Sequence, residues 1–457
     1  MNEYNVVDKK IDIPKEVKRI LEILEDNGFE AFAVGGCVRD SVLGRKPMDW
    51  DITTSALPMQ VKDIFRKTID TGLEHGTVTV RMNHQSFEVT TYRIDGAYND
   101  ARHPESVEFT SNLVEDLKRR DFTINAMAYN PSVGIVDAFG GIKDLEDGII
   151  KCVGVASERF SEDALRILRA VRFSAQLGFE IEDETAKAIR EMASTLEKIS
   201  AERIHVEIEK LIMSDNPSKL IDAYNLNITK VVLPEFDAMI NCEQNTPYHI
   251  YNVGEHTVKV MENIEPTKVL RWAALLHDVA KPVVATTDKD GRSHFKGHAL
   301  KGAYMSAKIL RRMRMDNKTI KEVGKLIRHH DDRPSDRVKD PEIVRRHVSV
   351  VGKEYYENYL KLAKADLLSK SELGISVGEK GYEYTLSQFR EIVEKGYPTS
   401  IKEMKFSGKN LMEIGCEKGE AIGIALDKLL DYVLKFPDKN ETSELERFAK
   451  KIIEKSK

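Results

Sequence analysis

The spacing of apolar residues changes once along this chain of 457 residues, and that change limits the possible folds more than any other feature. Up to about residue 150, short runs rich in β-branched and aromatic residues are typical of strands: EAFAVGG, DWDITT, TVTVRM and SFEVTTY. An amphipathic helix is expected before them, from Pro14 to Gly28. From Ser157 the spacing is helical, most clearly in SEDALRILRAVRFSAQLG. We therefore predict an α+β fold, a mixed sheet with helices followed by all-helical domains.

Changes of pattern divide the chain into four predicted parts. Residues 1–150 are mixed α/β, residues 151–240 are helical, residues 241–375 are helical and rich in histidine, and residues 376–457 form a lysine-rich helical tail. The length alone predicts about three domains of roughly 150 residues each.

Composition excludes a membrane-spanning or disulfide-built protein. No segment reaches the run of about 20 apolar residues that a membrane helix needs. The first residues, MNEYNVVDKKIDIPKEV, lack the apolar centre of a signal peptide, so we expect a cytoplasmic protein. The four cysteines are far apart and form no C-x-x-C pair, which favours reduced thiols: Cys37, Cys152, Cys242 and Cys416. With a net charge of only −5, nucleic-acid binding would require local basic surfaces.

Three acidic residues in the strand-like runs suggest a metal site. Asp49 and Asp51 are one residue apart in MDWDI, so they would share a face of an extended segment. Glu88 stands between apolar neighbours in a later run. Upstream, Gly35 and Gly36 lie between a strand and a helix, where backbone N–H groups can approach a phosphate. Converging carboxylates would hold two divalent cations for in-line displacement, whereas a lone D-x-D pair is usually only a solvated strand edge.

The order of these motifs resembles the DNA polymerase beta nucleotidyltransferase superfamily. Within it, VGGCVRDSVLG, MDWDITTSA, EHGTVTV, RRDFTINAMA and SEDALRILRAVRF resemble the class II tRNA nucleotidyltransferases (CCA-adding enzymes) and their bacterial poly(A) polymerase relatives. The similarity runs from about residue 20 to 240, and IGCEKGEAIGIALDKLLDYVL near the C-terminus also resembles these enzymes. The resemblance implies a nucleotidyltransferase head in 1–150, a base-reading and RNA-binding domain in 151–240, and a tRNA-binding tail in 376–457.

The resemblance also implies roles for single residues. Asp49 and Asp51 would carry catalytic Mg²⁺, and Glu88 would be the third acid by superfamily pattern. The triphosphate would be bound by Gly35, Gly36 and Arg39. The nucleotide would be contacted by Arg120, Asp121 and Asn125.

The segment SEDALR would read the incoming base. From the residues alone, Ser161 is expected to cap a helix whose first turn carries Glu162 and Asp163, with Arg166 beside Asp163. The resemblance implies that Glu162, Asp163 and Arg166 form the base-reading motif. Cytosine and adenine both offer an amino donor beside a ring-nitrogen acceptor, which an Asp–Arg pair complements and which uracil and guanine do not.

The implied activity is template-independent addition of CCA to the 3′ end of tRNA from CTP and ATP, with release of pyrophosphate. EHGTVTV favours this over poly(A) polymerase, which remains the alternative, and the uninterrupted loop RIDGAYNDARHPESVEF favours the complete CCA activity over the addition of CC alone. The basic tracts KILRRMRMDNKTIKEVGKLIRHH and RVKDPEIVRRH are either solvated helix faces or contacts to tRNA phosphates.

Histidines and aspartates in the third part follow the order H…HD…H…HH…D, which resembles the HD phosphohydrolase superfamily. The resemblance makes His256, His277, Asp278 and Asp366 the core ligands, with His298 and His329 completing a second site or binding phosphate; His330 is the alternative to His329. Such ligands suit Mg²⁺, Mn²⁺ or Ni²⁺ and the hydrolysis of phosphoesters. This hydrolysis is a second candidate for the main activity, and an inactive fold that only holds tRNA is its rival.

Overall fold

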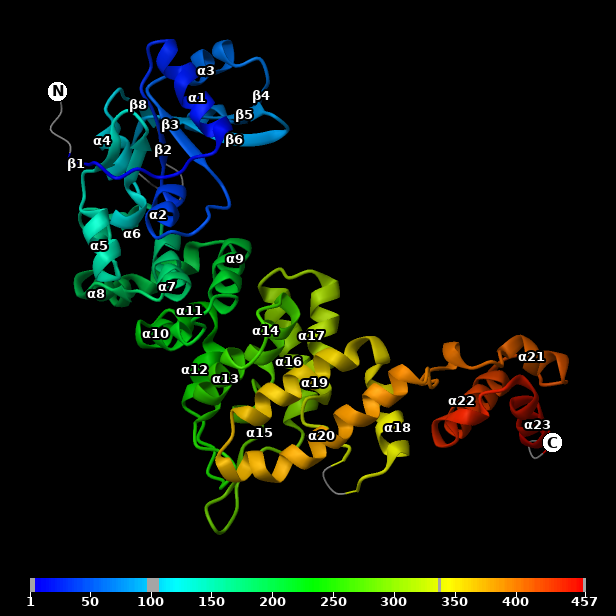
Figure 1. Ribbon diagram of the computed structural model, residues 1–457. Helices are drawn as coiled ribbons and strands as arrows, with labels where there is room; N and C mark the ends of the chain where they lie inside the picture. Colours follow the sequence, from blue (N-terminus) through cyan, green and yellow to red (C-terminus); the bar gives the residue numbers. More distant parts are fainter. Residues whose placement is uncertain (1–4, 97–106, 336–337, 455–457) are drawn as a thin grey trace. The chain divides into compact units, whose positions relative to one another are not determined.

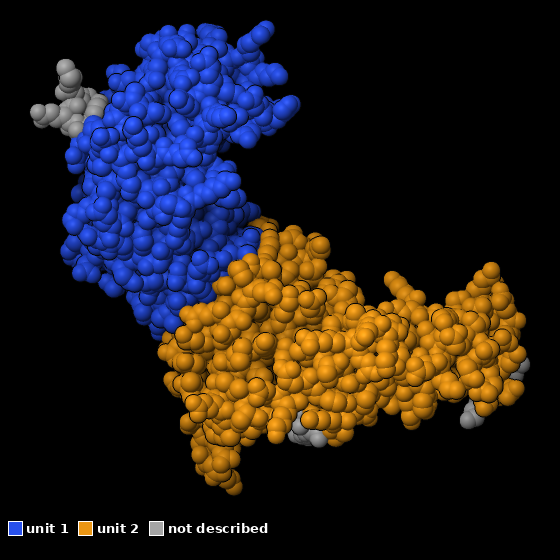
Figure 2. Space-filling model, viewed as in Figure 1, with its two compact units in different colours: residues 1–234 blue, residues 235–457 orange. Residues whose placement is uncertain are grey.

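The computed structural model describes residues 5–96, 107–335 and 338–454. It contains two compact units, residues 1–234 and residues 235–457 (Figure 2). The first combines a sheet with helices and the second is almost entirely helical (Figure 1), which confirms the predicted α+β fold. The finer boundaries near residues 150 and 375 stay predictions.

An eight-stranded mixed sheet is the centre of the first unit. Its strand order is β1-β10-β9-β2-β3-β6-β5-β4, and only the β3–β6 pair is parallel. The four runs predicted to be strands supply β2, β3, β5 and β6. The strands are β1 (Val6–Val7), β2 (Ala31–Val34), β3 (Asp51–Thr54), β4 (Thr68–Gly72), β5 (Thr77–Met82), β6 (Gln85–Thr91), β9 (Met127–Asn130) and β10 (Gly134–Asp137). A separate ribbon pairs β7 (Arg93–Asp95) with β8 (Val107–Phe109).

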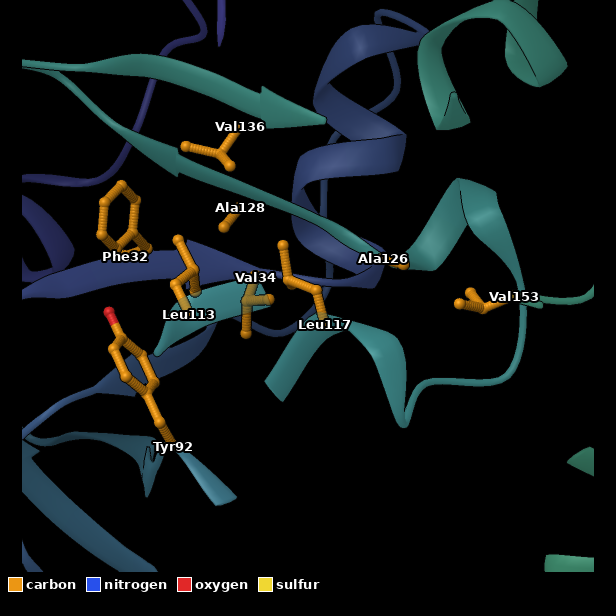
Figure 3. Packing of buried hydrophobic residues seen from close by; sticks show 9 residues of the cluster. All are labelled: Phe32, Val34, Tyr92, Leu113, Leu117, Ala126, Ala128, Val136 and Val153. Carbon is orange, nitrogen blue, oxygen red and sulfur yellow. The ribbon is translucent and has the colours of Figure 1, made fainter. Parts of the chain in front are cut away.

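Helices cover the sheet with their apolar faces. The helix α1 (Lys15–Asp26), predicted to begin at Pro14, buries Val17, Ile20, Leu21 and Leu24. The helix α4 (Leu113–Lys118) inserts Leu113 and Leu117, both fully buried, against sheet residues such as Val34 and Ala128 (Figure 3). Burying one leucine completely contributes about 1.5–3 kcal/mol, so these contacts fix the helices that frame the site. The remaining helices at the sheet are α2 (Gly36–Val42), α3 (Pro58–Ile64) and α5 (Gly141–Asp147).

Helices complete the first unit after the sheet. They are α6 (Ala156–Glu162), α7 (Leu165–Leu177), α8 (Asp183–Met192), α9 (Ala201–Ile212), α10 (Lys219–Asn225) and α11 (Thr229–Val232). Gly178 ends α7 in the left-handed conformation that glycine commonly adopts after a helix. A short strand pair joins β11 (Ile149–Ile150) to β12 (Glu180–Ile181).

In the second unit, helices pack around a cluster of histidines. The helices are α12 (Pro234–Ile240), α13 (Val253–Glu262), α14 (Lys268–Leu276), α15 (Lys281–Val284), α16 (His298–Arg312), α17 (Asn317–His329), α18 (Pro341–Val351), α19 (Lys353–Leu368) and α20 (Glu372–Glu394). A hairpin links β13 (Thr286–Thr287) to β14 (Ser293–His294).

The C-terminal helices have a core of their own. Leu411, Leu429, Val433 and Leu445 are fully buried where α21 (Gly408–Glu413), α22 (Glu420–Lys435) and α23 (Thr442–Glu454) meet. All four cysteines are free thiols, as their spacing predicts. Among the described residues, no helix combines the length and the apolar character needed to cross a bilayer.

Two candidate active sites

The first site begins with three acids on or next to two neighbouring strands, β3 and β6. Asp51 is the first residue of β3 and lies directly opposite Glu88 of β6 in the parallel ladder. Asp49 precedes the strand, although the sequence analysis expected it inside the strand. Desolvation raises the pKa of Asp51 most, the Arg120 guanidinium opposes this, and the charges of Glu88 and Asp49 raise it further.

These three acids suit a divalent cation. Desolvation is the main reason why the pKa of Asp51 is raised, and repulsion from Glu88 and Asp49 adds to it; a cation bound among the three acids would relieve that repulsion. Hard carboxylate oxygens are ligands that Mg²⁺ accepts, together with substrate phosphates. Among the described residues, however, they do not form a compact group with ligand atoms within 4.8 Å of one another, as acids and histidines of the second unit do.

The glycine pair and Arg39 lie beside these acids. Gly35 has a φ of +82°, and a Cβ there would come within 3.1 Å of Arg120 Nη1, so the position requires glycine. Gly36 begins α2, which also carries Arg39. The Arg39 Nη1 donates to Asn125 Oδ1 at 2.7 Å, which ties α2 to the RRDFTIN segment.

Asp121 extends this network. Asn125 Nδ2 donates to Asp121 Oδ1 at 3.1 Å, and Arg169 Nε of α7 donates to Asp121 Oδ2 at 2.7 Å. Burial alone would raise the pKa of Asp121, but Arg169 and Asn125 hold it well below its ordinary value. A continuous chain of polar contacts thus connects Arg39 to Arg169 across three elements. Sequence reasoning missed Arg169, although its spacing of three from Arg166 places both on one helix face.

The base-reading segment differs from its expected geometry. The predicted helix is interrupted: α6 ends at Glu162, and Asp163 is extended, with φ −142° and ψ 105°. Ser161 is not a cap; its hydroxyl donates to the Ser157 carbonyl. The interruption arises because the Asp163 carboxylate accepts the Leu165 N–H at 3.0 Å, the local side-chain bond that competes with a helix.

The ion pairs of the base-reading residues also differ. Arg166 pairs with Glu162, and its Nη2 donates to the Arg119 carbonyl at 2.8 Å. Asp163 Oδ2 instead accepts from Arg203 Nη2 of α9 at 2.7 Å. The expected Asp163–Arg166 pair is therefore replaced by two separate pairs, each side chain being held by a different partner. Arg203 lies 40 residues from Asp163, and no local pattern predicts that contact.

A cavity of about 250 Å³ collects these side chains. Its lining residues come from the RRDFTIN segment, the base-reading turn, α7 and α9: Arg119, Arg120, Asp121, Asp163, Leu165, Arg166, Arg169 and Arg203. Five of the eight are arginines, so the cavity suits an anionic ligand with a polar planar part, as a nucleotide has.

The second site is the buried histidine–aspartate cluster of the second unit. Asp278 follows α14, and its carboxylate lies 3.1 Å from His277 Nε2, 3.4 Å from His298 Nε2 and 3.5 Å from His330 Nε2. Asp366 Oδ1 of α19 lies 3.0 Å from His256 Nε2.

This cluster fits a divalent metal ion. His277 Nε2 and both Asp278 oxygens are buried, and despite these short distances they make no hydrogen bond among the described residues. Two overlapping sets have ligand atoms within 4.8 Å of one another: His256, His277 and Asp366, and His277, Asp278 and His330. Buried polar atoms without hydrogen bonds are costly, and a coordinated cation removes that cost.

Two lysines accompany the acids. Lys281 Nζ lies 2.7 Å from Asp278 Oδ2, and Lys370 Nζ lies 2.6 Å from Asp366 Oδ2. Burial alone would raise the pKa of Asp366, but Lys370 and His256 hold it well below the ordinary value. Burial lowers the pKa of His256, which keeps the imidazole neutral for a metal. Lys281 is three residues from Asp278, and Lys370 is four residues from Asp366. These spacings are the signal that could have predicted both lysines from the sequence.

The structure distinguishes the two adjacent histidines that the sequence left as alternatives, His329 and His330. The structure places His330, not His329, against Asp278 and His298, with 3.1 Å between the Nε2 atoms of His298 and His330. Successive side chains on a helix point about 100° apart, so only one of two adjacent histidines can face the cluster. His329 Nδ1 lies 2.7 Å from Asp332 Oδ2 instead.

Three domain models match the chain in order. They are the poly A polymerase head domain (residues 31–151), the probable RNA and SrmB-binding site of polymerase A (residues 178–240) and the HD domain (residues 246–366). The solved structure of a CCA-adding enzyme from Bacillus stearothermophilus in complex with CTP is 29% identical, with a TM-score of 0.70 over 96% of each chain. The chain therefore contains the head domain, the RNA-binding segment and the HD domain in this order, and it is similar to CCA-adding enzymes.

Several curated CCA-adding enzymes are similar to part of the chain. The enzyme of Lactiplantibacillus plantarum is 52% identical over 200 residues, 44% of this chain and 49% of the relative. That of Pediococcus pentosaceus is 44% identical over 264 residues, 57% of this chain and 65% of the relative. The chain therefore spans about half the length of most curated relatives it matches. The matches to the poly A polymerase head domain and to the HD domain together support a divalent metal ion as cofactor.

Proposed function

We propose that this chain adds C, C and A to the 3′ end of tRNA, using CTP and ATP and releasing pyrophosphate. The observation that carries the proposal is the arginine-lined cavity, because it brings the expected base-reading residues Asp163 and Arg166 together with Arg120 and Asp121. The enzyme of similar structure was solved with CTP, and the curated relatives carry the name of this activity.

Mg²⁺ would be held by Asp49, Asp51 and Glu88, which belong to the same unit as the arginine-lined cavity. Bound there, the ion would activate the attacking hydroxyl and neutralise charge on the triphosphate. The tRNA 3′ oxygen forms a bond to the α-phosphorus of the nucleotide, and the bond from that phosphorus to the pyrophosphate oxygen breaks. Arg39, with Gly35 and Gly36, would bind the triphosphate, while Arg120, Asp121 and Asn125 would position the nucleotide.

The held orientation of Arg166 supports selection of C and A. Glu162 and the Arg119 carbonyl fix its guanidinium, and Arg203 fixes Asp163. Fixed donors and acceptors discriminate because uracil or guanine would leave buried polar groups unpaired. The expectation drawn from the loop RIDGAYNDARHPESVEF falls mainly on residues 97–106, outside the described residues.

An incorporation assay tests the proposal. A tRNA transcript that lacks CCA is incubated with Mg²⁺ and labelled CTP and ATP, separately and together. We expect C addition from CTP alone and a complete CCA end from both nucleotides. No incorporation would contradict the proposal, and long A tails would identify a poly(A) polymerase.

We also propose a second activity, metal-dependent hydrolysis of phosphoesters at the histidine–aspartate cluster. It rests on the buried donor set around Asp278 and on the match to the HD domain. The ion would be Mg²⁺, Mn²⁺ or Ni²⁺, since histidine and carboxylate ligands accept all three. Hydrolysis of a chromogenic phosphodiester, compared between the chain and its Asp278→Asn variant with each metal, tests this activity. The substrates of the proposed CCA addition, tRNA and nucleoside triphosphates, are found in the cytoplasm, where we expect the protein.

A further inference from the structure

Two histidines and an aspartate form a second cluster, which the active sites described above do not use. His329 ends α17, Asp332 follows it, and His347 belongs to α18. Asp332 Oδ2 lies 2.7 Å from His329 Nδ1 and 3.3 Å from His347 Nε2. One donor atom from each of the three residues falls within 4.8 Å of the other two. The cluster therefore joins two helices through one carboxylate.

Tyr356 fixes the orientation of His347. The tyrosine is fully buried in α19, and its hydroxyl lies 2.8 Å from His347 Nδ1. A histidine that binds a metal through one ring nitrogen commonly uses the other for such a hydrogen bond, which sets its tautomer and direction. The bond directs His347 Nε2 towards Asp332, so the nitrogen available to a ligand is the one that faces the cluster.

The aspartate is held through its backbone and leaves its carboxylate accessible. The Asp332 N–H donates to the His329 carbonyl at 3.0 Å, and the Tyr359 hydroxyl donates to the Asp332 carbonyl at 2.5 Å. The Asp332 side chain is 48% exposed, whereas those of His329 and His347 are 9% and 11% exposed. One buried imidazole, one largely buried imidazole and one accessible carboxylate leave room for a further ligand from solvent.

This donor set is specific in its chemistry. Two imidazole nitrogens and one carboxylate oxygen with an open position match transition-metal ions such as Zn²⁺, whereas Mg²⁺ and Ca²⁺ prefer oxygen ligands. We propose that His329, Asp332 and His347 bind a first-row transition-metal ion of the Zn²⁺ class, at a site separate from the cluster around Asp278. Adjacent residues His329 and His330 thus serve different sites.

The alternative explanation of these contacts is a network of hydrogen bonds without a metal ion. In that network both histidines donate N–H bonds to Asp332. A metal ion would replace those protons, so binding would release them and weaken as the pH falls. The two states differ in metal content, which can be measured without reference to any enzymatic activity.

Metal stoichiometry of the full-length protein decides between them. The protein is stripped with a chelator, equilibrated with Zn²⁺ alone by dialysis, and analysed by mass spectrometry of the metal. We expect His347→Gln to bind one equivalent less than the unmodified chain. Asp332→Ala must lose the same equivalent, and because its side chain is half exposed this variant is expected to fold. Equal stoichiometry in either folded variant and the unmodified chain overturns the proposal.

Two further variants separate this site from other histidine contacts. His294 forms an exposed pair with Asp288, 2.8 Å from Nε2 to Oδ2, and belongs to none of the three-residue groups found among the described residues. His294→Gln is therefore expected to keep every equivalent, and a loss there would overturn the assignment. In Tyr356→Phe we expect the equivalent to remain, with affinity about 10- to 100-fold weaker; unchanged affinity would contradict the orienting role of Tyr356.

Discussion

The two candidate active sites differ in their residue types and in their burial. In the first unit, Asp49, Asp51 and Glu88 are exposed and spread along the edge of two strands, near an arginine-lined cavity. In the second, Asp278 and four histidines are buried and gathered within a few ångströms. We infer that the first site takes its metal together with the substrate phosphates, whereas the second holds its metal before any substrate arrives. The comparison predicts different responses to the same kind of substitution.

The largest effect is expected from Asp51→Asn. Removing one carboxylate from the proposed Mg²⁺ site should lower nucleotide incorporation by about 10³-fold, because the bound ion supplies several kcal/mol of transition-state stabilisation. The metal content of the second unit should not change. Asp70, which pairs with Lys62 at the surface, offers a matched control, and Asp70→Asn should leave incorporation intact. Equal incorporation in Asp51→Asn and Asp70→Asn would contradict the assignment.

Asp278→Asn should produce the opposite pattern. We expect loss of the tightly bound metal and of phosphodiester hydrolysis, because one carboxylate lies against three histidine nitrogens and Lys281. Incorporation of C and A into tRNA should stay within about twofold, because the two sites share no residue. If Asp278→Asn abolished incorporation and Asp51→Asn did not, the hydrolase would be the principal activity.

Asp121→Asn should destabilise the first unit in a pH-dependent way. Since the buried carboxylate pairs with Arg169, we expect a loss of about 2–3 kcal/mol in the free energy of unfolding at pH 7. The pKa of Asp121 is lowered in the folded state, so this contribution is present above the unfolded-state pKa of about 4 and is lost as the pH falls further.

Trp50 provides the measurement for that prediction. The chain has two tryptophans, Trp50 in the first unit and Trp272 in the second. In a Trp272→Phe background, Trp50 fluorescence in urea reports the first unit. If the stability difference between the chain with Asp121 and its Asp121→Asn variant stayed unchanged from pH 7 to about pH 2, the ion-pair account would be refuted.

The smallest effect is expected from Arg203→Gln. The substitution removes the partner of Asp163 and leaves the three acids of the proposed Mg²⁺ site unchanged. KM for CTP and ATP should therefore rise about 10-fold, which corresponds to the loss of one charge-assisted hydrogen bond, and discrimination against UTP should fall. Lys210, an exposed residue of the same helix, provides the control variant Lys210→Gln. Lower kcat with unchanged KM and selectivity would indicate that Arg203 does not position Asp163.

The sequence predicted local features of both regions better than contacts between distant segments. Alternating apolar residues identify the strands that carry Asp51 and Glu88, since each strand has a buried face. Arg203 could not be found this way, because its contact with Asp163 depends on how α9 packs beside α7.

One mistake and one alternative left open by the sequence have simple physical causes. The Ser161 cap was expected because a serine before acidic residues is typical of a helix start, but Asp163 interrupts the helix with its own backbone bond. His329 and His330 are adjacent, so both fit the spacing of the motif. Only the direction of each side chain at the end of α17 distinguishes them. Predictions for the remaining site residues concern roles that the variants above must test.

Sequencing the 3′ ends of the product RNA tests the central claim most directly. A tRNA transcript ending at the position before CCA is incubated with all four nucleoside triphosphates and Mg²⁺, and individual ends are read. Addition of C, C and A, followed by a stop, is the predicted result. Ends with runs of A, ends containing U or G at the frequency of their supply, or unextended tRNA would contradict it.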